Sequence, residues 1–339
     1  MKRILTFFAA AALAVGCGSP EKTAPEKIIV AYVTGYGRPV IPDTDLMTHI
    51  NYAFGHVTGT FDGVTVQNPE RLSALMELKK IKPELKIQLS IGGWTSGNFS
   101  EMASTPETRR AFAEDCLRLV EEYGLDGIDI DWEYPTSSVA GISSSPDDTE
   151  NYTLLMAELR EVLGPDRLLT YASDDSAMFI DHKAVLPYVD FVNVMAYDMG
   201  NAPNMSSALY ESENTTEFTA DRAVRAHLEA GIPKEKLVMG LPFYGRGSAE
   251  KYADYIDFRN IDTTKAEFTV KWDDKALIPY ITDGSGELVF NYENPHSIRL
   301  KCKYLLDNEL LGAMYWDYGA DDDNGSLSKV VAFEVLGVD

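Results

Sequence analysis

The chain has 339 residues, of which 45% are hydrophobic and 24% are charged, and its formal net charge is −23. This length suits one large folded domain, since α/β barrels often run to about 250 residues as a single unit. The strong negative charge argues against nucleic acid and anionic lipid as partners and is compatible with a neutral substrate.

The N-terminal residues have the pattern of an export signal. A basic start precedes an apolar run over residues 4–15, which is too short to span a membrane. Cys17 follows a small residue, an arrangement that resembles a bacterial lipoprotein signal. We therefore expect residues 1–16 to be a signal peptide, Cys17 to carry a lipid, and residues 17–26 to tether the protein to the bacterial cell envelope, in the periplasm or at the outer membrane. Ordinary secretion without a lipid is the alternative.

From residue 27 onward, strand-like runs alternate with helical stretches. The eight strand-like runs are residues 28–33, 49–54, 86–91, 127–131, 168–172, 191–195, 237–241 and 312–316. Helical spacing is found in residues 71–80, 108–123, 150–163, 219–230 and 297–308. This alternation predicts an α/β fold of the (β/α)8 TIM-barrel type over residues 27–339. A doubly wound open sheet is the alternative, but residues 35–39 are too short for its phosphate loop and end in proline.

Residues 247–295 interrupt the alternation. They carry scattered Tyr, Thr and Val residues and a turn signal at Asp283-Gly284. We expect a small α+β insertion, mostly antiparallel, between the seventh and eighth strands of the barrel.

Two cysteines fall within the predicted domain, Cys116 and Cys302. The barrel places them on the third and seventh helices, far apart around the ring. We therefore predict two free and mostly buried thiols, despite the exported setting.

The stretch Asp126-Gly-Ile-Asp-Ile-Asp-Trp-Glu-Tyr-Pro135 crowds four carboxylates onto a predicted strand and its end. Asp129, Asp131 and Glu133 share one face, with neighbours in that row roughly 6.6 Å apart. Like charges at that spacing repel and raise at least one pKa, which suits a group that must be protonated near neutral pH. Asp126 has the opposite parity, and we expect it to be structural.

Other chemistry-bearing residues fall at the C-terminal ends of predicted strands, where a barrel builds its active site. Parity places Met195 and Tyr197 on one face of the sixth strand, and Met314 and Trp316 on one face of the eighth. Carboxylates beside flat aromatic rings suit carbohydrate, because hydroxyl groups need directed acceptors. Glycosidic bond cleavage is the reaction that uses a protonated carboxyl beside an ionised one.

Four motifs and one single tryptophan, in order along the chain, resemble glycoside hydrolase family 18, the chitinases and endo-β-N-acetylglucosaminidases. The pattern Asp126-x-x-Asp129-x-Asp131-x-Glu133 is similar to the family's D-x-x-D-x-D-x-E signature. The other matches are Ser90-Ile-Gly-Gly93 on strand three, Met195-Ala-Tyr-Asp198 on strand six, Gly240-Leu-Pro-Phe-Tyr-Gly-Arg246 on strand seven, and Trp316 on strand eight.

The resemblance implies a role for each matched residue. Glu133 corresponds to the general acid, and the substrate's own N-acetyl oxygen is the nucleophile, giving an oxazolinium ion. Asp131 orients the acetamido group, Asp129 is its charge-sharing partner, Tyr197 holds the acetamido group, and Trp316 lies under the sugar. Substrate contacts are further expected from Met195, Asp198, Phe54, Trp94, Gly93, Tyr134 and Arg246. Core packing is the alternative for Phe54 and Met195, and a salt bridge is the alternative for Arg246.

The resemblance therefore implies a retaining glycosidase of the chitinase branch that acts on chitin or chitooligosaccharides. An endo-β-N-acetylglucosaminidase acting on N-glycans and a non-catalytic chitooligosaccharide-binding lectin are the alternatives. Retention of Glu133 weighs against the lectin. We expect no cofactor, no metal and no nucleic-acid partner, and a monomer attached to the membrane only through its lipid. The acidic run resembles a calcium loop only superficially, because its sixth position is Tyr134 where glycine is needed.

Overall fold

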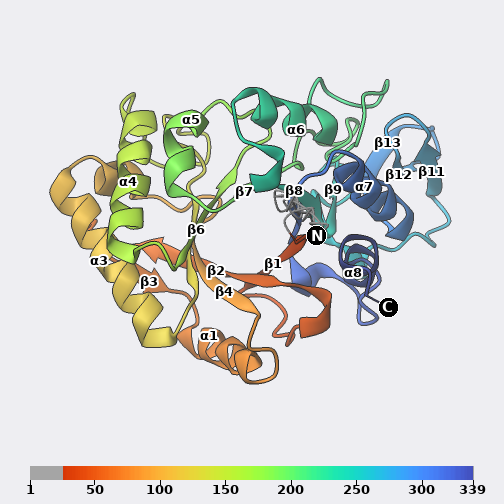
Figure 1. The fold of residues 1–339 in the computed structure, drawn as a ribbon. Coiled ribbons are helices and arrows are strands. Elements are labelled where there is room, and N and C mark those ends of the chain that lie inside the picture. The colour runs from red at the N-terminus through yellow and green to blue at the C-terminus, as the bar shows by residue number, and fades with distance from the viewer. Residues whose placement is uncertain (1–25, 339) are drawn as a thin grey trace, which may run out of the picture.

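A closed barrel of eight parallel strands forms the centre of the computed structural model, which describes residues 26–338 (Figure 1). Neighbouring strands follow the order β1-β14-β8-β7-β6-β5-β4-β2, and pairing of β1 with β2 closes the ring. The strands are β1 (Ile28–Thr34), β2 (His49–Val57), β4 (Lys86–Gly92), β5 (Gly127–Asp131), β6 (Leu168–Ser173), β7 (Val192–Val194), β8 (Leu237–Pro242) and β14 (Gly312–Trp316). All eight lie where the sequence predicts them, so the TIM-barrel prediction is confirmed. The export signal, the Cys17 lipidation site and all but the last residue of the tether lie outside the described residues.

Helices cover the outside of the barrel (Figure 1). Five were predicted and are α1 (Pro69–Met76), α3 (Pro106–Tyr123), α4 (Asp148–Leu163), α6 (Ala220–Glu229) and α7 (Pro295–Asp307). The unpredicted elements are α2 (Phe99–Ala103), α5 (His182–Val185), α8 (Ser328–Leu336) and the short strand β3 (Val64–Val66). Most of these are too short to show a period, and α8 is too uniformly apolar. No helix in residues 26–338 is long and apolar enough to cross a membrane.

Local sequence signals fix where the long helices begin and end. Thr105 precedes α3 and accepts a hydrogen bond from the Thr108 backbone at 3.2 Å, with Pro106 at the first helical position. Gly124 ends the same helix at φ 73°, a conformation that favours glycine. Asn294 caps α7 in the same way, accepting from two backbone N–H groups. These caps orient the helices as they pack against the barrel.

A five-stranded antiparallel sheet is inserted between β8 and β14, as the sequence predicts. Its strands are β9 (Tyr244–Gly247), β10 (Tyr255–Asp257), β11 (Thr269–Asp273), β12 (Ile278–Thr282) and β13 (Leu288–Tyr292), in the order β10-β9-β13-β12-β11. The sheet begins at Tyr244, slightly before the predicted residue 247, and lies beside α7 in Figure 1. Strand β9 follows β8 after a single residue. It pairs with β10, and the two strands form one wall above the barrel.

Cys116 and Cys302 are both free and buried, which confirms the prediction for the two thiols. They lie on α3 and α7, which belong to separate parts of the helical layer. Burial also raises the pKa of both thiols, so neither is an activated nucleophile.

Two histidines are buried side by side between β6 and the helices α5 and α6. The rings of His182 and His227 lie 5.1 Å apart, and His182 Nδ1 lies 2.6 Å from the Tyr171 hydroxyl. The other histidine lies 2.8 Å from the Ser173 hydroxyl through Nε2. Burial, together with the neighbouring ring, lowers the pKa of His182 to about 3. Burial likewise lowers the pKa of His227.

Acid should therefore destabilise the protein through these histidines. Below about pH 6.5, His182 binds a proton in the unfolded chain but stays neutral in the folded protein. The folded protein therefore loses stability as the pH falls. When the pH falls from 7 to 5, we expect the free energy of unfolding of the wild type to decrease by about 2 kcal/mol more than that of His182→Gln. Urea unfolding at both pH values tests this, with exposed His296→Gln as the control. Equal losses in all three proteins would contradict it.

Candidate active site

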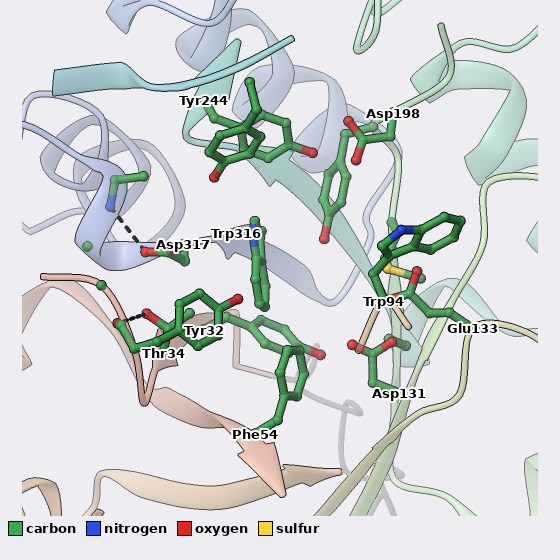
Figure 2. Close-up of a pocket in the computed structure, with 18 of the residues that line it drawn as sticks. Tyr32, Thr34, Phe54, Trp94, Asp131, Glu133, Asp198, Tyr244, Trp316 and Asp317 are labelled. Carbon is green, nitrogen blue, oxygen red and sulfur yellow. Dashed lines mark hydrogen bonds between the residues drawn. The ribbon is translucent and has the colours of Figure 1, made fainter. Parts of the chain in front are cut away.

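The C-terminal ends of the barrel strands and the inserted sheet surround one large cleft of about 1100 Å³ (Figure 2). Ten of the residues predicted for the site line it: Phe54, Trp94, Asp131, Glu133, Tyr134, Met195, Tyr197, Asp198, Arg246 and Trp316. They come from strands far apart in the sequence, because parallel strands of a barrel all end at the same mouth. Asp129 and Gly93 are the two predicted residues that do not line it.

Asp129 lies beneath the cleft, fully buried on β5. Its carboxylate accepts four hydrogen bonds, two to each oxygen. The donors are Tyr32 at 2.8 Å, Ser90 at 2.8 Å, Thr170 at 2.7 Å and Asn193 at 3.2 Å. Burial raises the pKa of Asp129, and the four donors oppose that rise. A carboxylate so fully occupied is a fixed charge that supports the site from below.

Asp131 is two residues further along the strand, at the floor of the cleft. It is 3% exposed, and its Oδ1 has no hydrogen-bond partner among the described residues. Burial raises the pKa of Asp131 well above its usual range, and the charges of Glu133 and Asp129 raise it further. Buried polar atoms are nearly always paired, so this oxygen marks a position where a ligand can supply the partner.

Glu133 follows β5 and lies at the rim of the cleft above Asp131 (Figure 2). Burial, aided by the charge of Asp198, raises the pKa of Glu133 to about 7. At neutral pH a large share of this carboxyl is therefore protonated, and the carboxyl lines the cleft. That is the state required of a general acid.

An aromatic platform forms the opposite side of the floor. Trp316 stacks on Phe54 with ring centroids 5.4 Å apart and an angle of 19° between the planes. Tyr32 packs against the same tryptophan at 5.6 Å. In Figure 2, Trp316 stands between Asp317 and the pair of acids, Asp131 and Glu133. The indole and the two acids thus line the same cleft from different strands.

Tyr197 also lines the cleft; burial raises the pKa of its phenol, and the nearby charges of Asp131, Asp198 and Glu133 raise it further. Among the described residues its hydroxyl contacts only the sulfur of Met314, at 3.8 Å, which is a weak acceptor. The phenol therefore keeps its proton available for a ligand. Met195 lines the cleft nearby and is partly exposed there, so it is more than core packing.

Asp198 and Arg246 are joined by two parallel hydrogen bonds of 2.7 Å each. The guanidinium also lies 5.3 Å above the rings of Tyr244 and Tyr255. The alternative predicted for Arg246, a salt bridge, is thus present, although both partners still line the cleft. The pair ties the inserted sheet to the end of β7.

Gly93 was predicted to contact substrate, but the structure places it behind the cleft wall. A Cβ at this position would lie 2.5 Å from the Phe54 ring, and its φ of 90° is accessible mainly to glycine. Gly92 is equally constrained, because its Cβ would lie 1.9 Å from the Asp131 carbonyl oxygen. The two glycines allow Phe54 and Asp131 to approach closely, so we correct the role of Gly93 to packing.

Trp94 and Tyr134 form the rim on the side of Glu133. Trp94 is 56% exposed and lies 6.5 Å from Tyr134, edge to face. Tyr134 is held by stacking on Phe179 at 5.0 Å. An exposed tryptophan beside a cleft offers a second platform for a ligand that extends out of it.

Several lining residues were not predicted, among them Tyr32, Tyr36, Asp175, Tyr244, Tyr255 and Asp317. The position of Tyr32 near the end of the first strand was an available signal. The inserted residues carried none, because their approach to the barrel mouth depends on the fold of the insertion. Within residues 26–338, no group of three or more His, Cys, Asp or Glu side chains is arranged to hold a metal ion.

The chain is similar in sequence to known proteins. The sequence model described as "Glycosyl hydrolases family 18" matches residues 28–321. Chitinase A1 of Niallia circulans is 33% identical over 324 residues, which cover 80% of this chain but only 46% of that relative. Chitinase 1 of Aphanocladium album is 30% identical over 361 residues, which cover 89% of this chain and 83% of the relative.

Solved structures share the whole fold. A glycoside hydrolase family 18 N-acetylglucosaminidase from Paenibacillus barengoltzii superposes with a TM-score of 0.83 at 35% identity, covering 91% of this chain and 100% of that chain. The chain thus spans the full length of this relative, but less than half of Chitinase A1.

Proposed function

The chain belongs to glycosyl hydrolase family 18, and from this membership we propose that it cleaves β-1,4 linkages next to N-acetylglucosamine with retention of configuration. The observation that carries the proposal is the pairing of two acids in the cleft, one at its rim and one at its floor. Glu133 is a carboxyl with a pKa of about 7, and beside it Asp131 has a buried oxygen without a partner.

In the proposed first step, Glu133 donates its proton to the glycosidic oxygen as the bond to the anomeric carbon breaks. The N-acetyl oxygen of the sugar on Trp316 attacks that carbon from the opposite face and forms an oxazolinium ion. Asp131 accepts the acetamido N–H through its free oxygen, and its negative charge stabilises the cation in a low-dielectric setting. The hydroxyl of Tyr197 donates a hydrogen bond to the acetamido oxygen and holds that oxygen in line with the anomeric carbon.

In the second step a water molecule attacks the same carbon and gives its proton to Glu133, now ionised, while the bond from that carbon to the acetamido oxygen breaks and the acetamido group is restored. Two displacements at one carbon retain its configuration. Asp129 is excluded as a nucleophile because both its oxygens are occupied by donors below the cleft. Burial and the charge of Glu133 raise the pKa of Asp131, and Asp129 raises it further.

Chitin or chitooligosaccharides are the proposed substrates, supported by relatives named chitinases. The solved relative named an N-acetylglucosaminidase suggests short products. An endoglycosidase that acts on N-glycans is the second candidate, because the same two acids serve any β-linked N-acetylglucosamine. The retained Glu133 supports catalysis over a lectin function.

Parallel assays on chitooligosaccharides and a denatured glycoprotein test the substrate. We expect cleavage of the oligosaccharides only. Release of intact glycans with the oligosaccharides untouched would move the proposal to the second candidate. A thiazoline mimic of the oxazolinium should inhibit, and a glycosyl ester trapped on Asp131 would refute the mechanism.

Activity should fall as the pH rises above about 7. The pKa of Glu133 is raised to about 7, and only its protonated form can donate to the leaving oxygen. We expect kcat/KM for an unactivated chitooligosaccharide to fall about tenfold per pH unit on the alkaline side. A steady rate up to pH 9 on that substrate would contradict the assignment.

We further propose that the protein is exported and anchored by a lipid at Cys17 in the bacterial cell envelope. The support is the sequence pattern of residues 1–16 with Cys17. Labelling with a radioactive fatty acid tests it, since Cys17→Ala should abolish incorporation. Retained label in that variant would sink the proposal.

A further inference from the structure

The two ends of the cleft differ. At the end beyond Glu133 the lining is exposed, with Trp94 at 56% and Val139 at 66%. At the opposite end, beyond Trp316, the cleft meets two arginines, Arg38 and Arg259. One end is therefore open to solvent over apolar side chains, and the other meets charged side chains.

A second, smaller hollow of about 470 Å³ lies directly beyond those arginines. Its lining consists of Arg38, Arg259, Asn260, Asp322, Asp323 and Asn324. Arg38 and Arg259 line both hollows, so their side chains form the partition between them. The two hollows therefore meet at these two arginines.

Ion pairs hold the partition from both sides. Arg38, in the loop after β1, pairs with Asp323, in the loop after β14. Arg259, which follows β10, donates to Asp257 at 2.6 Å. The partition thus takes its residues from three segments, and the pair of Arg38 with Asp323 joins two of them, the barrel loops after β1 and β14.

The chemistry assigns this closed end to the non-reducing side of the substrate, a step that rests on the proposed function. Glu133 protonates the leaving oxygen, so the leaving sugar extends toward Trp94. The non-reducing end of the sugar on Trp316 then points toward Asp317. This aspartate lies on the side of the indole away from the two acids (Figure 2). Any preceding sugars must point at the arginine partition.

The side chains at the arginine end of the cleft suit the terminal sugar of an oligosaccharide. Carboxylates accept hydrogen bonds, and Asp257 and Asp317 both line the cleft there. A terminal sugar has a free 4-hydroxyl that can donate, whereas an interior sugar has a glycosidic oxygen that cannot. The smaller hollow beyond has no aromatic residue in its lining, so it offers a sugar no platform.

We propose that Arg38, paired with Asp323, and Arg259 close the glycone end of the cleft and make the enzyme cut at a fixed short distance from the non-reducing end of its substrate. The partition sets the product length, and the open end beyond Trp94 leaves the length of the leaving chain unrestricted.

Reducing-end-labelled chitooligosaccharides of four, five and six sugars test this in initial-rate product analysis. With the wild type we expect each substrate to be cut at one dominant bond, at the same distance from the non-reducing end. In Arg38→Ala/Arg259→Ala, and in the milder Arg38→Gln, we expect cuts further from that end to rise several-fold. Arg38 and Asp323 are surface side chains, 38% and 78% exposed, so Arg38→Gln should change thermal unfolding little.

Arg299→Ala is the control, because it removes a half-exposed arginine that pairs with Glu334 on the helical layer. Its products should equal those of the wild type. Initial cuts at several bonds by the wild type, or unchanged products in both Arg38 variants, would overturn the inference. If instead no oligosaccharide is cleaved at all, the proposed function itself fails.

Discussion

Replacing Glu133 by Gln should lower kcat on chitooligosaccharides by roughly 10²–10⁴-fold, because the amide has no proton to give the leaving oxygen. Glutamine keeps the size of the side chain, and the floor of the cleft is made by other residues. Trp316 and Phe54 remain stacked, and Asp131 keeps its free oxygen. Oligosaccharide binding should therefore stay within a few-fold of the wild type, measured by calorimetry with the uncleaved variant.

Glu161→Gln is the control for charge alone, since its side chain is 71% exposed on α4 and remote from the cleft. It should retain full turnover. Turnover by Glu133→Gln near that of the wild type would refute the acid assignment. Loss of binding together with turnover would show that Glu133 mainly holds the substrate in place.

Replacing Lys301 by Met should destabilise the fold by about 3–5 kcal/mol, because it leaves a buried carboxylate without its partner. Lys301 on α7 and Glu293 are both fully buried and form an ion pair. The ammonium also donates to the Ser207 carbonyl, and the Ser207 hydroxyl donates to Glu293 at 2.6 Å. This network joins the loop before α6 to the end of the inserted sheet, and urea unfolding measures its contribution.

Two further variants distinguish the effect of breaking the buried ion pair from the effect of substituting a lysine on α7. Lys303→Met, on the same helix, breaks an exposed pair with Asp307 and should cost less than about 1 kcal/mol. The double variant Lys301→Met/Glu293→Leu removes both charges and should recover much of the loss. A single variant as stable as the wild type would mean that Glu293 is protonated or hydrated once the lysine is gone.

The barrel was predictable because each strand carries its own signal. Runs of β-branched residues at regular spacing identify strands locally, and their order along the chain dictates a closed parallel ring. Two of the helices that were missed, α2 (Phe99–Ala103) and α5 (His182–Val185), have too few residues to show a period. They are stabilised by packing on the barrel and not by their own sequence.

Parity along β5 (Gly127–Asp131) also placed its acids on one face, but it could not assign their depth. Asp129 and Asp131 are equivalent in the sequence pattern, yet one has four donors and the other has an oxygen with none. The donors to Asp129 come from four other strands, so only the closed ring could reveal the difference. The same holds for Gly93, whose close contact with Phe54 is a contact between strands.

The sequence by itself determined the strand order, the reactive motif and the resemblance to a glycosidase family, because these depend on residue type and on spacing along one strand. The tertiary structure decided what depends on contacts between distant segments. It paired Arg246 with Asp198, stacked Trp316 on Phe54, and set Arg38 against the far end of the cleft. Hydrogen bonds and desolvation act over a few ångströms in space, and distance along the chain does not reveal which groups come that close.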